Sequence, residues 1–123
     1  MLFAIEHLEP KLSEWLLIEY SHAIQIAGRD RVVITNVRNP AERKKLQRFA
    51  RVESRSVAEL FPRPRLLVLD PRARKSLHPA DVKESTVVVV GGILGDDPPQ
   101  GRTEKLLSSK LRAKRRNLGK GQL

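Results

Sequence analysis

The amino-acid sequence predicts an α/β fold, a mainly parallel five-stranded sheet with helices on both faces. Two segments, Arg65–Asp70 and Thr86–Val90, contain aliphatic runs that do not alternate with polar residues. Such runs are typical of parallel strands that are buried on both faces. Segments with helical spacing of apolar residues lie between the predicted strands, and this order of elements favours an α/β fold.

Composition limits what the chain can be. Its 123 residues are enough for one domain, spanning residues 1–123, and with 4% aromatic residues the core must be aliphatic. No segment approaches the roughly 18 uninterrupted apolar residues of a membrane span, and the amino end has no signal-peptide pattern. The absence of cysteine is typical of an intracellular protein, so we expect a cytoplasmic location and no membrane partner. Three scattered histidines have no metal-ligand spacing, so no metal site is predicted.

The first predicted elements are a strand and a long helix. Leu2–Ile5 is the strand, and Glu6 lies at its carboxyl end. The helix begins near Pro10 or Ser13, of which Ser13 is a good N-cap, and ends at Gly28, which suits a left-handed C-cap. Trp15 widens the apolar face of this helix, so we expect it in the core.

The next segment contains a strand and two helix starts. Arg31–Val37 is the second strand. A helix then begins with Asn39 as N-cap and Pro40 in its first position, with Glu42 in reach of a capping-box contact. Ser56–Glu59 matches a second capping box and predicts a single helical turn that Pro62 ends.

The remaining elements follow from similar signals. Arg65–Asp70 and Thr86–Val90 are the third and fourth strands, and a short helix over Pro79–Glu84 separates them. Thr103 is a suitable cap for a helix that runs to about Leu111. Arg115–Leu118 is expected to form a short fifth strand.

A loop rich in glycine and proline leaves the fourth strand. Gly91 and Gly92 end the strand, and Gly95, Pro98 and Pro99 prevent a helix from starting at once. Open α/β sheets place ligands at the carboxyl ends of their strands, so the loop is a candidate ligand site. A simple turn explains these glycines equally well.

The chain carries a formal net charge of +10, which favours association with polyanions such as RNA or the ribosome. A soluble surface rich in Lys and Arg is the alternative explanation. The sequence sets no oligomeric state beyond a monomer or a homodimer. The basic residues proposed to contact a ribosomal protein, the ribosome or RNA are Arg43, Lys44, Lys45, Arg48, Arg112, Lys114, Arg115 and Arg116.

Two consecutive segments carry a family resemblance. LLVLDPRARKSLHPADV followed by VVVVGGILGDDPPQGRT resembles one group of SPOUT-class methyltransferases, and most closely the protein-arginine methyltransferases of that class and their archaeal relatives. AIEHLEPKLSEWLLIEYSHA at the start and RRNLGKGQ at the end agree. The resemblance covers nearly the whole chain and is weakest between Asn36 and Pro64.

The resemblance implies a trefoil knot, which is a rare exception to the rule that protein chains are not knotted. In the family, a final helix after the last loop completes the knot. This sequence ends at Leu123 before such a helix, so the knot is expected to be incomplete in it. A fragment of a longer chain is expected here, with a curtailed family member as the alternative.

The resemblance also implies S-adenosylmethionine as cofactor, held by three loops at one sheet edge. Glycines there allow close approach of the backbone, while Leu94 and Leu118 suit the adenine faces. Asp70 or Asp96 is expected to accept from the ribose or to favour the sulfonium charge. The expected cofactor-binding residues are Leu69, Asp70, Pro71, Gly91, Gly92, Ile93, Leu94, Gly95, Asp96, Leu118, Gly119 and Gln122.

The activity that the resemblance implies is methylation of an arginine on a protein, plausibly a ribosomal one. Methylation of RNA and a basic binding module without catalysis are the alternatives. A guanidinium acceptor must be held by carboxylates and must lose a proton. Glu6 is the first candidate, followed by Glu14 and Glu19, with Asp70 as a possible base. Arg72 is expected to orient a carboxylate of the site, although simple pairing with Asp70 is equally open.

Overall fold

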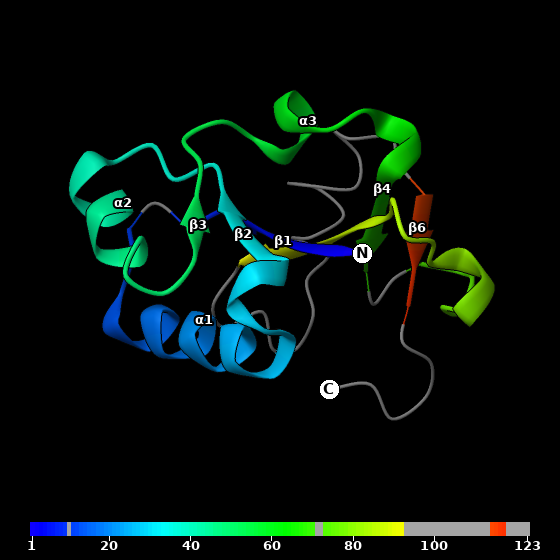
Figure 1. Cartoon of the computed structure of the whole chain (residues 1–123), viewed down its shortest axis with the longest axis horizontal. Helices are drawn as coiled ribbons and strands as arrows, with labels where there is room; N and C mark the ends of the chain where they lie inside the picture. The colour runs from blue at the N-terminus through cyan, green and yellow to red at the C-terminus, as the bar shows by residue number, and fades with distance from the viewer. Residues whose placement is uncertain (10, 71–72, 93–113, 118–123) are drawn as a thin grey trace.

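A computed structural model describes residues 1–9, 11–70, 73–92 and 114–117, which form an α/β structure around one sheet (Figure 1). Short 3-10 turns lie at Arg29–Arg31, Arg63–Arg65 and Pro79–Asp81. The helices and strands are β1 (Leu2–His7), α1 (Glu14–Ala27), β2 (Val32–Thr35), α2 (Pro40–Leu46), β3 (Arg51–Val52), α3 (Val57–Leu60), β4 (Leu66–Leu69), β5 (Val87–Gly92) and β6 (Lys114–Arg116).

The sheet has six strands in the order β3-β2-β1-β5-β4-β6, and every pair of neighbours is parallel. The predicted α/β class and parallel sheet are confirmed, but the predicted number of five strands is wrong. The extra strand is β3, in which Arg51 and Val52 pair with Val33 and Ile34. Two residues at a sheet edge carry no periodic pattern, so only their pairing with β2 reveals them.

Helix α1 follows its predicted signals. The Ser13 hydroxyl accepts a hydrogen bond of 3.1 Å from the Leu16 amide, and Gly28 ends the helix with φ +95°. Leu16, Tyr20 and Ile24 recur every fourth residue and are buried against the sheet. The expectation that Trp15 is a core residue is wrong, because its side chain is 63% exposed.

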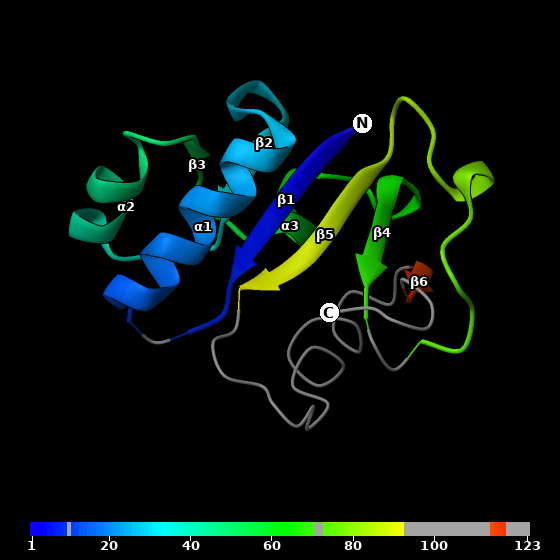
Figure 2. The same cartoon turned by 90° about the horizontal axis from the view of Figure 1, so that it is seen from below.

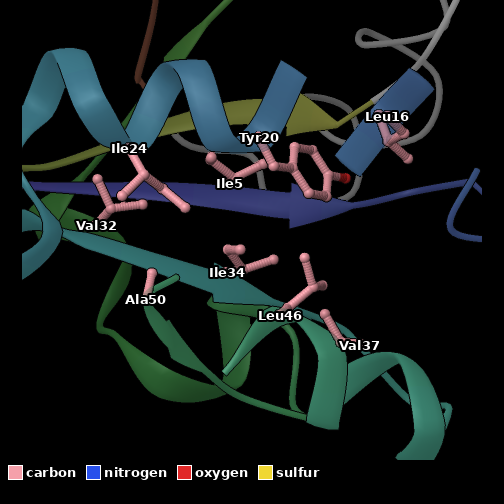
Figure 3. Packing of buried hydrophobic residues seen from close by; sticks show 9 residues of the cluster. All are labelled: Ile5, Leu16, Tyr20, Ile24, Val32, Ile34, Val37, Leu46 and Ala50. Atoms are coloured by element: carbon pink, nitrogen blue, oxygen red, sulfur yellow. The ribbon is translucent and has the colours of Figure 1, made fainter. Parts of the chain in front are cut away.

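Buried residues form two clusters, one on each face of the sheet. One joins Ala4, Val33 and Val89 to Val57 of α3. The other joins β1 and β2 to α1 and α2, with Tyr20 between Leu16 and Ile5 (Figure 3). Helices therefore cover both faces, as the sequence predicts. Figure 1 shows α1 and α3 on opposite sides of the sheet.

The two other helix starts are also as predicted. Asn39 Oδ1 accepts from the amides of Ala41 and Glu42, and Ser56 and Glu59 form a complete capping box at α3. Glu42 itself makes no capping-box contact. Its carboxylate accepts instead from the amide of Leu12, at 2.8 Å, so it joins α2 to the segment before α1.

The later elements agree in part with the sequence. Pro79–Asp81 forms one 3-10 turn rather than a helix to Glu84, and the last strand is Lys114–Arg116, one residue earlier than expected. Asn117 continues the pairing as an isolated bridge to Ser76. The predicted helix over 103–111 and the loop that would enter the knot lie outside the described residues. No helix within the described ranges has the length and apolar character needed to cross a membrane.

Candidate functional site

The carboxyl ends of the parallel strands meet at one edge of the sheet. Figure 2 shows the arrowheads of β1, β4 and β5 pointing to the same edge. Glu6 and His7 at the end of β1 are in register with Gly91 and Gly92 at the end of β5. This edge is where an open α/β sheet places ligands, so the site is built here from the residues that it carries.

Four of the predicted cofactor-binding residues are described, and the structure brings them to this edge. Gly91 and Gly92 are the last residues of β5, and Leu69 and Asp70 end and follow β4 next to it. Leu69 also lines an apolar trough of about 430 Å³ on the sheet face beside α1, together with Val90. The other predicted cofactor-binding residues lie outside the described part of the chain: Pro71, Ile93, Leu94, Gly95, Asp96, Leu118, Gly119 and Gln122. Arg72, which is predicted to orient a carboxylate, also lies outside it.

Asp70, which directly follows β4, connects this strand to the last strand, β6. Its side chain is 1% exposed, and Oδ2 lies 3.5 Å from Nη1 of Arg115 in β6. The Asp70 amide also donates to the carbonyl of Arg116 at 2.9 Å. These contacts bring the ends of β4 and β6 together, which is what a site made from the loops after both strands requires.

Arg116, the next residue of β6, pairs with Asp81. Its Nε donates to Asp81 Oδ2 at 3.1 Å, and Asp81 also accepts from the His78 amide at 2.9 Å. The His78 amide bond, followed by the bond from Arg116, lowers the pKa of Asp81. Two of the predicted polyanion contacts, Arg115 and Arg116, are therefore engaged with carboxylates of the same chain.

The predicted basic face of α2 is more exposed to solvent than Arg115 and Arg116 are. Lys44, Lys45 and Arg48 are exposed, and no carboxylate of the described residues forms an ion pair with them. Arg43 is half-buried and donates to the carbonyls of Val37 and Arg38, which fixes it to the end of β2. Lys114 is exposed on the edge strand β6, and Arg112 lies outside the described residues.

Glu6, the first candidate for holding the acceptor, is buried and fully engaged. Its carboxylate accepts hydrogen bonds from the hydroxyls of Thr35 and Ser56 and from the amide of Val57, and the residue is 4% exposed. A carboxylate held in this way joins β1, β2 and the start of α3. A catalytic role for Glu6 stays a prediction that the structure does not test.

The two other carboxylates considered for the acceptor differ in position. Glu14 is exposed in the first turn of α1, where its charge suits the helix end. Glu19 lines a small cavity of about 170 Å³ between α1 and the end of β5, together with Tyr20 and Gly91.

His7, which follows Glu6, forms a second buried polar group at the same edge. Its Nδ1 lies 2.8 Å from the Tyr20 hydroxyl, and its Nε2 lies 3.6 Å from Glu42 Oε1. Burial lowers the pKa of His7 below its usual value, although the Glu42 carboxylate opposes this change. Burial likewise raises the pKa of Tyr20, so the phenol stays protonated at neutral pH.

A polar pocket of about 360 Å³ opens beside His7, at the ends of β1 and β2. Asn36 has φ +63°, and its Nδ2 donates to the His7 carbonyl at 2.8 Å, which fixes the chain at this turn. The Arg38 guanidinium contacts Asn36 Oδ1 and Glu59, so it is turned toward neighbouring residues. The polar residues that line the pocket are His7, Glu9, Asn36, Arg38, Asn39 and Glu42.

Sequence reasoning did not identify this pocket. The sequence predicts Glu42 to be a capping residue and assigns no role to His7. One signal in the sequence could have indicated the pocket: both strands end in polar residues, Glu6-His7 and Thr35-Asn36. The carboxyl ends of parallel strands share one edge of the sheet, so these residues are expected to lie close together.

Comparisons with known proteins identify the family and support the fold. The family described as "SFM1-like: Protein arginine N-methyltransferase SFM1-like" matches residues 2–123. Protein arginine N-methyltransferase SFM1 of Saccharomyces cerevisiae is 32% identical over 120 residues, which cover 86% of this chain and 56% of that protein. The chain thus spans little more than half the length of that curated relative.

Solved structures give the same result. The yeast arginine methyltransferase SFM1 complexed with SAH superposes with a TM-score of 0.81 at 29% identity, over 96% of this chain and 63% of that one. A dual specific Trm10 from Thermococcus kodakaraensis has a TM-score of 0.70 at 17% identity, over 97% of this chain and 78% of that one, and shows the shared fold alone. The expected SPOUT-like fold is therefore confirmed, and the chain belongs to the SFM1-like protein arginine N-methyltransferase family.

Proposed function

We propose that this protein is an S-adenosylmethionine-dependent protein arginine methyltransferase. The observation that carries the proposal is the meeting of Leu69–Asp70 and Gly91–Gly92 at one sheet edge, in a chain whose family match covers residues 2–123. The related yeast SFM1 has been solved in complex with SAH and with SAM. The position of the glycine pair fits such a ligand, since it lies at the carboxyl end of a central parallel strand.

The described residues at this edge fit the cofactor in kind. Leu69 is half-buried beside the apolar trough and offers an aliphatic surface, while Gly91 and Gly92 allow the backbone to come close to a ligand. Asp70 links the end of β4 to β6 through its contact with Arg115. Pro71, Gly95 and Leu118 are expected to complete the site from segments beyond the described residues.

The cofactor, when bound, supplies a methyl group on a positively charged sulfur, so that the S–C bond breaks as an N–C bond forms and the bonding electron pair stays on sulfur. The protein must place the acceptor nitrogen in line with that bond and exclude water. It must also remove one proton from the acceptor, because a guanidinium is protonated at neutral pH.

Calorimetric titration of a chain that includes the final helix of the family with S-adenosylhomocysteine tests cofactor binding. We expect micromolar affinity, about −8 kcal/mol. Gly95→Val is expected to abolish binding while the circular-dichroism spectrum stays that of the folded protein. Ser85→Val, at the opposite end of β5, is the matched control and should bind normally. Absence of heat and of a thermal shift at millimolar ligand would contradict the proposed function.

The acceptor is proposed to be an arginine of a ribosomal protein. The exposed basic residues Lys44, Lys45 and Arg48 support a contact with ribosomal RNA near such a substrate. A tritiated-methyl assay on ribosomes, followed by separate protease and nuclease digestion, tests the acceptor. Label released by protease supports the proposal, and label that only nuclease releases would make RNA the acceptor instead.

A further inference from the structure

The pocket at the ends of β1 and β2 contains a buried ring nitrogen that makes no hydrogen bond, although the Glu42 carboxylate lies near it. His7 is 5% exposed, and among the described residues its Nε2 is the buried side-chain atom with no hydrogen-bond partner. Buried polar atoms normally have a partner, and an exception calls for a ligand or another explanation. The atom faces Glu42 Oε1 at 3.6 Å, and both residues line the pocket.

The charge of the pocket favours a cation. Glu42 uses Oε2 to accept from the Leu12 amide, which holds the carboxylate in place with Oε1 on the side of His7. Glu9 adds a second carboxylate to the lining, whereas the lining cation, Arg38, contacts Asn36 and Glu59. No three acidic or histidine side chains in the described ranges converge closely enough to hold a metal ion, so an organic cation fits better.

The pocket also lies next to the predicted cofactor loop. His7 is in register with Gly92, and the Tyr20 hydroxyl that contacts His7 belongs to a side chain that also lines the cavity beside Gly91. A group held in the pocket is therefore one strand away from Gly91 and Gly92 at the end of β5. This is the position that an acceptor requires if the cofactor contacts these glycines.

We infer that this pocket binds the guanidinium of the acceptor arginine, with Glu42 as the carboxylate that holds it and His7 Nε2 as the atom that receives its proton. The inference rests on the proposed function. A carboxylate suits a guanidinium because the planar group donates two parallel hydrogen bonds to it. The role of Nε2 requires the tautomer in which Nδ1–H donates to the Tyr20 oxygen, a bond that the hydroxyl is able to accept.

The proton balance follows from these contacts. As the N–C bond forms and the bond between methyl carbon and sulfur breaks, one guanidinium N–H proton passes to Nε2 of His7. The resulting imidazolium lies beside Glu42, which stabilises its charge, and the proton then leaves to solvent. Glu6, the residue before His7, is engaged elsewhere, since its carboxylate accepts from the Val57 amide.

Binding of a guanidinium can be tested without a methyl donor. Long-range ¹⁵N NMR spectra of His7 report both its tautomer and the occupation of Nε2. The probe is N-acetyl-arginine methylamide, and the corresponding citrulline compound is a neutral probe of nearly the same shape. We expect a saturable shift of the Nε2 resonance with the arginine probe and none with citrulline.

Two variants complete the test. Glu42→Gln keeps the shape of the side chain and should weaken binding of the arginine probe by roughly tenfold or more, since a charge-assisted hydrogen bond is lost. Glu84→Gln, an exposed carboxylate before β5, should bind as the unmodified protein does. An unchanged Nε2 resonance in the unmodified protein, or equal binding by Glu42→Gln, would overturn the inference.

The experiments distinguish a failure of the proposed methyltransferase function from a failure of the guanidinium pocket. Titration with S-adenosylhomocysteine should give the same affinity for Glu42→Gln and the unmodified protein. If the arginine probe binds and the cofactor does not, the proposed function fails while the guanidinium pocket stands. If the cofactor binds and the arginine probe does not, the pocket assignment is wrong and the methyltransferase function stands.

Discussion

The amide of Val57 donates a hydrogen bond of 2.9 Å to the carboxylate of Glu6, which lies 51 residues earlier in the chain. The Ser56 hydroxyl donates to the other oxygen of the same carboxylate at 2.6 Å. Glu6 thus attaches the first turn of α3 to the end of the central strand β1. Glu6 therefore helps to fix the position of α3, together with the packing of Val57 in the core.

Glu6→Gln is therefore expected to lower the free energy of unfolding by about 1–3 kcal/mol, because one acceptor oxygen is replaced by an amide donor in a buried site. Urea denaturation measures the change. Glu84→Gln, which removes an exposed carboxylate, is the control and should be close to neutral. If Glu6→Gln keeps its stability and loses methyl transfer, Glu6 acts on the acceptor rather than on α3.

Stability should fall as the pH decreases from 7 to 5, in part because of His7. Burial holds the pKa of folded His7 below the usual 6.5, against the opposing effect of Glu42, with Glu9 and Tyr20 also close to the ring. Between 6.5 and this lower pKa the unfolded state binds more protons, so acidification favours unfolding.

This pH dependence can be checked by comparing the unmodified protein with the variants His7→Gln and His22→Gln. The stability of His7→Gln, measured by urea denaturation at pH 7, 6 and 5, should decrease less than that of the unmodified protein. His22→Gln, at an exposed position of α1, should decrease as much as the unmodified protein. Equal slopes for His7→Gln and the unmodified protein would show that His7 is not the group responsible.

Asn36 permits a left-handed backbone conformation at the end of β2. Asn36→Gly keeps this conformation accessible and loses the hydrogen bond to the His7 carbonyl, so we expect a loss of about 1 kcal/mol. Asn36→Ala should lose roughly a further 1 kcal/mol, since alanine tolerates φ +63° less well. The melting temperature in thermal denaturation should therefore be highest for the unmodified protein, lower for Asn36→Gly and lowest for Asn36→Ala. A reversed order of the variants would contradict the role given to the backbone.

Binding of single-stranded RNA tests the basic face of α2. Replacing Lys44 and Lys45 with glutamine removes two potential phosphate contacts and should reduce the log–log salt slope by about 1.4. The control is the double variant Lys11→Gln/Lys83→Gln, which removes two exposed charges elsewhere. An equal reduction in both variants would indicate attraction by net charge alone.

Local signals in the sequence are sufficient for most of the fold. The aliphatic runs before Asp70 and Gly91 predict two central strands because both of their faces are buried. Ser13, Asn39 and Ser56 predict three helix starts because capping needs only neighbouring residues. Strand β3 was missed because its two residues are defined by their partner in β2.

The candidate site is harder to predict from the sequence than the fold. His7, Tyr20 and Glu42 come from three elements, and no local spacing indicates that they meet. The sequence likewise treats Glu6 as a polar residue at a strand end, although its partners lie in β2 and at the start of α3. Long-range hydrogen bonds determine which carboxylate is available at a site, and the folded chain is needed to assign them.

The place of β1 in the sheet has a consequence for synthesis of the protein. The strand made first lies between β2 and β5, so a growing chain supplies its second neighbour only when Val87–Gly92 has been made. Until then one long edge of β1 has unpaired backbone groups, which are a template for association with other chains. Closing a parallel pair over so many residues is also slow, because the intervening chain must be ordered first. A ribosome that stalls before Val87 would release a chain whose central strand is open on one side, and chaperones are expected to protect that edge during translation.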